Sequence, residues 1–218
     1  MGQIPGIVLS VVITYFAGAI PTAYIFGRIL KGIDIRKHGS GNIGATNAFR
    51  VLGKGPGAVV LAIDVLKGLV PLVVLANIFG FENPLILVFL GLVAVAGHNW
   101  TVFLNFKGGK GIATSLGVLI ALAIQVPTVQ PVLLVTVGVW VVVFLLSGYV
   151  SAASILAVVA LPITMVIWSV PLPIIIMGII LCIFIVFRHR PNIQRLIEGK
   201  EPCVLLPTHK LFKNNKLN

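Results

Sequence analysis

A polar segment that contains three glycines, residues 39–50, carries side chains suited to binding an anion. Glycines let the backbone approach a ligand closely, and a helix that begins after the last glycine would add amides that point at an anion. Hydroxyl and amide groups donate hydrogen bonds, and a guanidinium fork suits phosphate. We therefore predict phosphate binding by Ser40, Asn42, Gly44, Thr46, Asn47 and Arg50. The alternative is an ordinary glycine-rich loop with Asn42 or Thr46 as a helix N-cap.

A second glycine-rich cluster, residues 107–114, follows an apolar run. Its spacing is typical of backbone amides that wrap a phosphate beneath an ammonium group. The residues that we predict for this role are Lys110, Gly108, Gly109, Gly111 and Thr114. No GxxxxGK[ST] pattern surrounds the lysine, so a nucleotide is not predicted. The alternative is a lysine that anchors a span at the lipid headgroups.

A third polar group consists of Ser151 and Ser154, expected in a turn, and of His189 and Asn192 where the last apolar segment ends. Histidine titrates near neutral pH, so His189 could act as a general base or bind phosphate as a cation. The alternative is an interfacial histidine between arginines that face headgroups. Glu198 and Glu201 are expected to pair with arginines of the tail.

The sequence offers neither paired carboxylates for acid–base chemistry nor a His/Cys set at metal spacing, and we predict no metal and no cofactor. No disulfide is expected between Cys182 and Cys203. The chemistry is therefore expected to depend on positioning and electrostatics around anions.

The elements that position these residues are predicted to be membrane helices. Of 218 residues 58% are hydrophobic and 10% charged, and the mean hydropathy is +1.11. These values indicate one all-α integral membrane domain, residues 1–218. About 20 apolar residues cross a bilayer. Seven transmembrane helices are predicted, two of them short, over residues 4–30, 56–79, 85–104, 112–126, 132–147, 150–170 and 173–187.

The basic residues predict the topology of these helices. The net charge is +11, and of the 16 lysines and arginines six lie within residues 28–54, two within 107–110 and seven from residue 188 onward. This pattern follows membrane topology, so nucleic acid is not a predicted partner. The N-terminus is predicted outside the cytoplasm and the C-terminus inside it, with cytoplasmic regions 31–54, 105–114, 147–154 and 188–218. Five spans would give the same orientation. Asp64 and Lys67 share a helix face and are expected to form an ion pair within the membrane.

The three motifs together resemble the bacterial acyl-phosphate:glycerol-3-phosphate acyltransferase family. They are residues 39–50, residues 98–114 and the run His189-Arg190-Pro191-Asn192-Ile193-Gln194-Arg195-Leu196 with Glu201. The resemblance implies a seven-helix enzyme of the bacterial inner membrane whose active site faces the cytoplasm. It implies transfer of a fatty acyl group from acyl phosphate to the sn-1 hydroxyl of glycerol 3-phosphate, the first acylation of phospholipid biosynthesis. The implied products are lysophosphatidic acid and inorganic phosphate.

The resemblance also assigns residues and partners. The catalytic residues that it implies are Ser40, Arg50, Lys110, His189 and Asn192, and Ser154 matches a functional serine although Ser151 lies close by. The bilayer and an enzyme that supplies acyl phosphate are the expected partners. An organic-phosphate transporter and a scaffold for anionic lipid are the alternatives, but the polar clusters lie on one predicted side, and a scaffold leaves the glycines unexplained.

Overall fold

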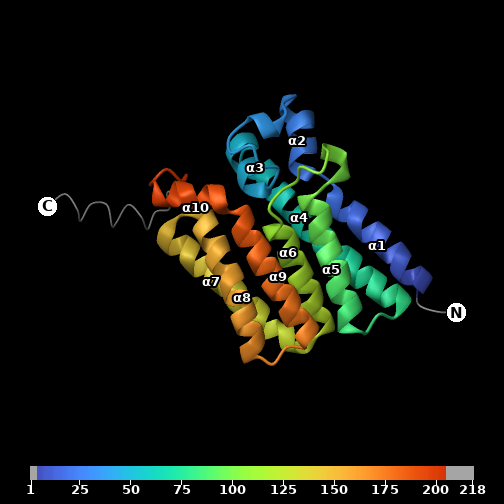
Figure 1. Cartoon of the computed structure of the whole chain (residues 1–218). Coiled ribbons are helices and arrows are strands. Elements are labelled where there is room, and N and C mark those ends of the chain that lie inside the picture. Colours follow the sequence, from blue (N-terminus) through green and yellow to red (C-terminus); the bar gives the residue numbers. More distant parts are fainter. Residues whose placement is uncertain (1–3, 205–218) are drawn as a thin grey trace. The chain divides into compact units, whose positions relative to one another are not determined.

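The computed structural model describes residues 4–204, and all regular structure within them is helical. The chain divides into two compact units, Met1–Pro127 and Thr128–Asn218. Figure 1 shows the helices of each unit. The first unit contains α1 (Ile4–Ala19), α2 (Thr22–Lys31), the 3₁₀ turn η1 (Ile35–Lys37), α3 (Ala45–Leu52), α4 (Lys54–Phe79), α5 (Pro84–Asn99), η2 (Val102–Leu104) and α6 (Ile112–Gln125). The second contains α7 (Gln130–Ser147), α8 (Val150–Ile167), α9 (Leu172–Arg188) and α10 (Arg190–Ile197), preceded by η3 (Pro127–Val129).

Helix α4 is the centre of the first unit, and glycines bring α6 against it. A Cβ atom on Gly68 of α4 would collide with the carbonyl oxygen of Thr114, and one on Gly117 of α6 with that of Val65. Small residues allow helix backbones to approach closely where hydrocarbon surrounds the helices and burial from water drives no association. Gly18 and Gly97 bring α1 and α5 together in the same way.

The first predicted span, residues 4–30, is broken into α1 and α2. The helices are bent by 40° at residues 20 and 21. Proline has no amide hydrogen and cannot continue a helical ladder, which accounts for the break at Pro21. Ile20 O then accepts a hydrogen bond from Thr22 N at 3.0 Å.

Four stretches within residues 4–204 are long and apolar enough to cross a membrane, and the number rises to six if each bent pair, α1 with α2 and α9 with α10, counts as one span. The stretch that ends at Ser147 is longer than predicted, because helical turns begin at Pro127 and give 21 residues. A proline is tolerated in the first turn of a helix, so Pro131 lies inside α7. Helix α6 is short, as predicted, with 14 residues.

In the second unit, α8 packs against both α7 and α9, and α10 contacts the ends of α8 and α9. One prediction is wrong here. Helix α8 begins at Val150, so Ser151 and Ser154 lie on a helix and not in a turn. Val204 N donates a hydrogen bond to Gly148 O at 2.9 Å, which fixes the end of the described chain to the turn between α7 and α8. Of the predicted cytoplasmic region 188–218, residues 205–218 lie outside the described part of the chain.

Candidate functional site

The first motif is a loop that closes on the side chain of Asn47, which is only 1% exposed. Its Nδ2 donates hydrogen bonds to the carbonyl oxygens of His38 at 3.0 Å and Asn42 at 2.9 Å. Its Oδ1 accepts a hydrogen bond from Ser40 N at 2.9 Å. The two amide hydrogens of Asn47 are therefore used within the loop. We predicted this side chain as a donor to a ligand, and the structure instead gives it the role of holding the motif in shape.

Helix α3 begins directly after Gly44, as expected for an anion-binding loop. Gly44 is the N-cap residue, and Asn42 Oδ1 accepts a hydrogen bond from its amide at 2.9 Å. Neither Asn42 nor Thr46 is the N-cap, so the plain capping alternative is wrong. Ser40 and Thr46 are exposed. The hydroxyls of the motif therefore face outward, while its amide side chains shape the loop.

Arg50, on the last turn of α3, is exposed and makes no ion pair among residues 4–204. Asp34, the N-cap residue of η1, is paired with another arginine. It accepts hydrogen bonds from Arg36 Nε at 2.9 Å and Nη2 at 2.7 Å. These bonds lower the pKa of Asp34 to about 2. Arg50 therefore keeps its guanidinium available for an anion.

The second motif closes on the C-terminal end of α5. Gly108 N donates to Asn99 O at 3.0 Å, and Gly109 N donates to His98 O at 3.1 Å. These bonds satisfy carbonyls that a helix end leaves without an intrahelical partner. We predicted that the two amides wrap a phosphate. The structure shows instead that both are already used, and that the glycines are required for close packing, since a Cβ on either would collide with His98.

The remaining residues of the second motif differ in exposure. Lys110 is half-buried. Gly111 has φ 83°, in the left-handed region that favours glycine, and is the N-cap of α6. Thr114 is fully buried and packs toward α4 at Gly68, so its hydroxyl does not line an exposed surface. In Figure 1 this loop, α2 and α3 lie at the same end of the first unit.

The third motif, in the second unit, is organised around Glu201. Asn192 Nδ2 donates to Glu201 Oε1 at 2.6 Å, and Arg195 Nε lies 2.7 Å from Oε2. Burial raises the pKa of Glu201, but the hydrogen bonds from Asn192 and Arg195 outweigh burial and lower it. The predicted pairing of this glutamate with a tail arginine is confirmed.

His189 and Ser154 are both buried in this unit. His189 Nδ1 lies 2.8 Å from Ile185 O. A carbonyl can only accept, so Nδ1 carries a hydrogen, and the lone pair of a neutral ring is on Nε2. Ser154 Oγ donates to Val150 O at 2.8 Å and accepts from Trp140 Nε1 at 3.2 Å. Of the two candidate serines, Ser154 belongs to the packing of α8 on α7, and Ser151 is buried in the first turn of α8.

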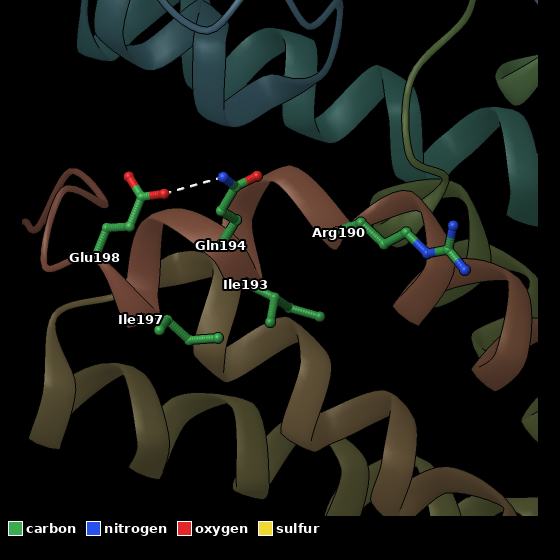
Figure 2. A pocket seen from close by; sticks show the side chains of 5 residues that line it. All are labelled: Arg190, Ile193, Gln194, Ile197 and Glu198. Carbon is green, nitrogen blue, oxygen red and sulfur yellow. Dashed lines mark hydrogen bonds between the residues drawn. The ribbon is translucent and has the colours of Figure 1, made fainter.

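A groove of about 340 Å³ follows α10. Figure 2 shows Ile193 and Ile197 pointing to one side of this helix, while the side chains of Gln194 and Glu198 are joined by a hydrogen bond of 3.0 Å. Glu198 also lies 3.0 Å from Lys200, so its predicted pairing with an arginine is wrong. The groove is lined by Arg190, Ile193, Gln194, Ile197 and Glu198, none of which belongs to the predicted site.

The family model described as Glycerol-3-phosphate acyltransferase matches residues 8–199. The chain belongs to this acyltransferase family. A glycerol-3-phosphate acyltransferase of Trichormus variabilis is 43% identical over 209 residues, covering 89% of this chain and 90% of the relative. One of Gloeobacter violaceus is 44% identical over 193 residues, with 88% and 91% covered.

Two solved structures have the same fold as this acyltransferase. They are crystal structures of PlsY (YgiH), an integral membrane glycerol 3-phosphate acyltransferase, and both are 39% identical to this chain. The glycerol 3-phosphate form has a TM-score of 0.82 and covers 94% of this chain and 98% of its own. The lysophosphatidic acid form has a TM-score of 0.79, with 91% and 95% covered. The chain is thus a multi-pass membrane acyltransferase.

Proposed function

We propose that this acyltransferase moves a fatty acyl group from acyl phosphate to the sn-1 hydroxyl of glycerol 3-phosphate. The hydroxyl oxygen forms a bond to the acyl carbonyl carbon, and the bond from that carbon to the phosphate oxygen breaks. Inorganic phosphate leaves, and lysophosphatidic acid is formed. The hydroxyl proton passes to the donor phosphate or to His189 Nε2. The observation that carries the proposal is the pair of cationic, glycine-rich motifs at one end of the first unit.

The chemistry of the substrates suits this set of residues. An acyl phosphate is a mixed anhydride with a good leaving group, so the main task is to hold two anions together and aim a hydroxyl at the carbonyl. Arg50 and Lys110 offset the repulsion between the anions, and the acyl chain stays between helices in the bilayer. The PlsY relatives, whose crystal forms are named for glycerol 3-phosphate and lysophosphatidic acid, support the acceptor and the product.

We further propose that residues 1–218 act as one catalytic domain. Ser40, Arg50 and Lys110 come from the first unit, and His189 and Asn192 from the second. Asn42, Gly44 and Thr46 support substrate binding, whereas Asn47, Gly108, Gly109, Gly111 and Thr114 act by shaping the two loops. The predicted binding role of Ser154 is not kept, because its hydroxyl is used in the packing of α8 on α7. Neither a cofactor nor a metal takes part in the proposed step.

The proposed location is the bacterial plasma membrane, with seven spans and a cytoplasmic active site. In this proposal α6 is the seventh span, in addition to the four long apolar stretches and the two bent pairs, each counted as one span. At about 1.5 Å per residue its 14 residues extend about 21 Å, less than the roughly 30 Å of a hydrocarbon core. A short helix packed on α4 would let the loop before it lie below the membrane surface, where acyl chains are accessible.

Transfer to labelled glycerol 3-phosphate by the purified protein in detergent tests the proposal. Palmitoyl phosphate and palmitoyl-CoA are compared as donors, and released phosphate is followed. We expect transfer from the acyl phosphate alone, with one phosphate released per ester formed. Transfer from the thioester alone would overturn the donor assignment.

A further inference from the structure

A buried polar network lies beside the second motif, and the proposed reaction does not use it. Asp64 and Lys67, one turn apart on α4, form the predicted ion pair, with Nζ 2.8 Å from Oδ1 and side chains 2% and 4% exposed. Thr22 Oγ1 donates to the same carboxylate oxygen at 3.2 Å, and Lys67 Nζ donates to Ile20 O at 3.0 Å. The pair therefore joins α4 to the break between α1 and α2.

His98 connects this ion pair to the second motif. Its Nδ1 lies 3.9 Å from Asp64 Oδ1, and its side chain is 5% exposed. On the other side of the ring, Nε2 lies so close to Gly109 that a Cβ there would collide with it. The backbone oxygen of His98 accepts the amide of Gly109 at 3.1 Å. The imidazole therefore separates a buried carboxylate from the glycine beside Lys110.

Stability alone gives a weak reason for such a network. Replacing a buried ion pair by apolar side chains of similar volume is often neutral or stabilising, because two charges lose their hydration when they are buried. A network that fixes one backbone geometry has a clearer purpose, since the groups that bind a substrate must be held to within about 0.5 Å.

We propose that Asp64, Lys67 and His98 are positioning residues that fix the loop of residues 107–111 in the shape that binds a phosphate group. The ligand class is a phosphate monoester or an acyl phosphate. The network acts through the backbone of Gly109 and touches neither substrate. This inference rests on the proposed function, because it assigns a support to the same site.

A double variant, Asp64→Leu with Lys67→Met, separates positioning from stability. It removes both charges but keeps side chains of similar size, so we expect a thermal midpoint near that of the wild type. His98→Phe keeps a ring but lacks both nitrogens, and His98→Gln restores a polar group near Nε2. Asn77→Ala is the matched control, because Asn77 also lies on α4, is exposed, and accepts a long hydrogen bond of 3.5 Å from Gln125 of α6.

Binding of glycerol 3-phosphate is measured by calorimetry on the detergent-solubilised protein without donor, and KM and kcat are measured for both substrates. We expect the double variant and His98→Phe to weaken glycerol 3-phosphate binding, or to raise KM for the acyl phosphate, at least tenfold. We expect kcat to stay within about threefold, His98→Gln to recover part of the loss, and Asn77→Ala to match the wild type.

Unchanged binding and KM for both substrates in variants that fold would overturn the inference. A loss of kcat alone would also overturn it, because positioning of a binding loop changes affinity first. The binding measurement needs no turnover. A wild type that binds glycerol 3-phosphate but transfers nothing from acyl phosphate would therefore overturn the donor assignment. Weaker binding of glycerol 3-phosphate by the variants would still support the positioning role of the network.

Discussion

At the scale of single residues, Arg50 is the side chain on which the proposed binding of phosphate depends most directly. It lies at the end of α3, and its exposed guanidinium makes no ion pair within residues 4–204. Arg36, in the same region of the chain, is instead held by Asp34. A planar fork binds phosphate through two parallel hydrogen bonds, which an ammonium group cannot reproduce.

We expect Arg50→Ala to lower kcat/KM at least 100-fold, which corresponds to about 2.7 kcal/mol of transition-state stabilisation. Arg50→Lys should recover only part of this loss, since it restores the charge but not the fork. Lys37→Ala, which removes an exposed charge before the motif, should stay within about twofold. Steady-state rates with palmitoyl phosphate check the series, and an Arg50→Ala enzyme of normal activity would remove Arg50 from the site.

Residue type alone does not reveal whether the side chain of Asn47 binds a ligand or holds its own loop. Its place in a glycine-rich loop predicts a polar role, but loop closure decides whether the amide faces a ligand or the backbone. Asn47→Asp replaces the donor amide by an acceptor opposite the carbonyls of His38 and Asn42. An unsatisfied buried carbonyl costs about 1–3 kcal/mol.

We therefore expect Asn47→Asp to loosen the loop without unfolding the membrane helices. Hydrogen exchange should rise at residues 35–47 and remain unchanged in α5 and α6. Protection equal to that of the wild type across the loop would show that Asn47 does not hold it.

The lowered pKa of Glu201 predicts how the stability of the fold depends on pH. Its pKa in the folded protein lies below the ordinary value of 4.5. The charged carboxylate therefore stabilises the fold above pH 4.5, and this contribution is lost as the pH falls through the lowered pKa. Glu201→Gln should lower the thermal midpoint at neutral pH, and the difference from the wild type should shrink below pH 4.5.

Glu198→Gln is the control for that series, because the carboxylate of Glu198 is exposed and its pair with Lys200 is a surface pair. We expect it to change the midpoint little at any pH. A difference between Glu201→Gln and the wild type that stays constant from pH 7 to pH 3 would contradict the charged role of Glu201.

At the scale of elements, α4 is the helix against which the other helices of the first unit pack. Glycines let the backbone of α6 approach it closely. The sequence predicts α6 almost to its ends, since Gly111 and Pro127 bound a mostly apolar run. It does not predict the hydrogen bonds between the second motif and α5. Those join residues about ten apart around an irregular loop, and no helical or strand period relates them.

Gly117→Ala tests the close packing of α4 and α6. The added Cβ would collide with Val65 O, so we expect a loss of about 1–3 kcal/mol and a lower thermal midpoint in detergent. Gly138→Ala on α7 is the matched control, since no atom lies within 4 Å of its added Cβ. Alanine favours a helix over glycine by about 1 kcal/mol, so this variant should be as stable as the wild type or more stable. Equal effects of the two substitutions would contradict the packing.

At the scale of the whole molecule, composition and charge predict a helical membrane protein, and the structure and relatives confirm this class. Span count and orientation are harder to predict, because α6 is shorter than a bilayer core and the charge rule gives the same ends for five or seven spans. The third motif lies in the second unit, and its part in catalysis is proposed from the order of the motifs.

Labelling of cysteines in whole cells tests the proposed topology. Cys203 is exposed and follows α10. In a Cys182→Ser background, a membrane-impermeant maleimide should label Cys203 only after the cells are permeabilised. In a background that also carries Cys203→Ser, a cysteine introduced by Glu82→Cys, between α4 and α5, should be labelled in intact cells. The opposite pattern would invert the topology and place the three motifs outside the cytoplasm.

In the proposed reaction two bound anions react directly, without an acylated side chain. The most direct measurement is exchange of labelled inorganic phosphate into palmitoyl phosphate, with the purified protein and no glycerol 3-phosphate. An acyl-enzyme would form reversibly and incorporate the label. We predict no incorporation at enzyme concentrations that give rapid transfer once glycerol 3-phosphate is added. Steady incorporation of label without the acceptor would contradict direct transfer and point to a covalent intermediate, with Ser40 the first residue to examine.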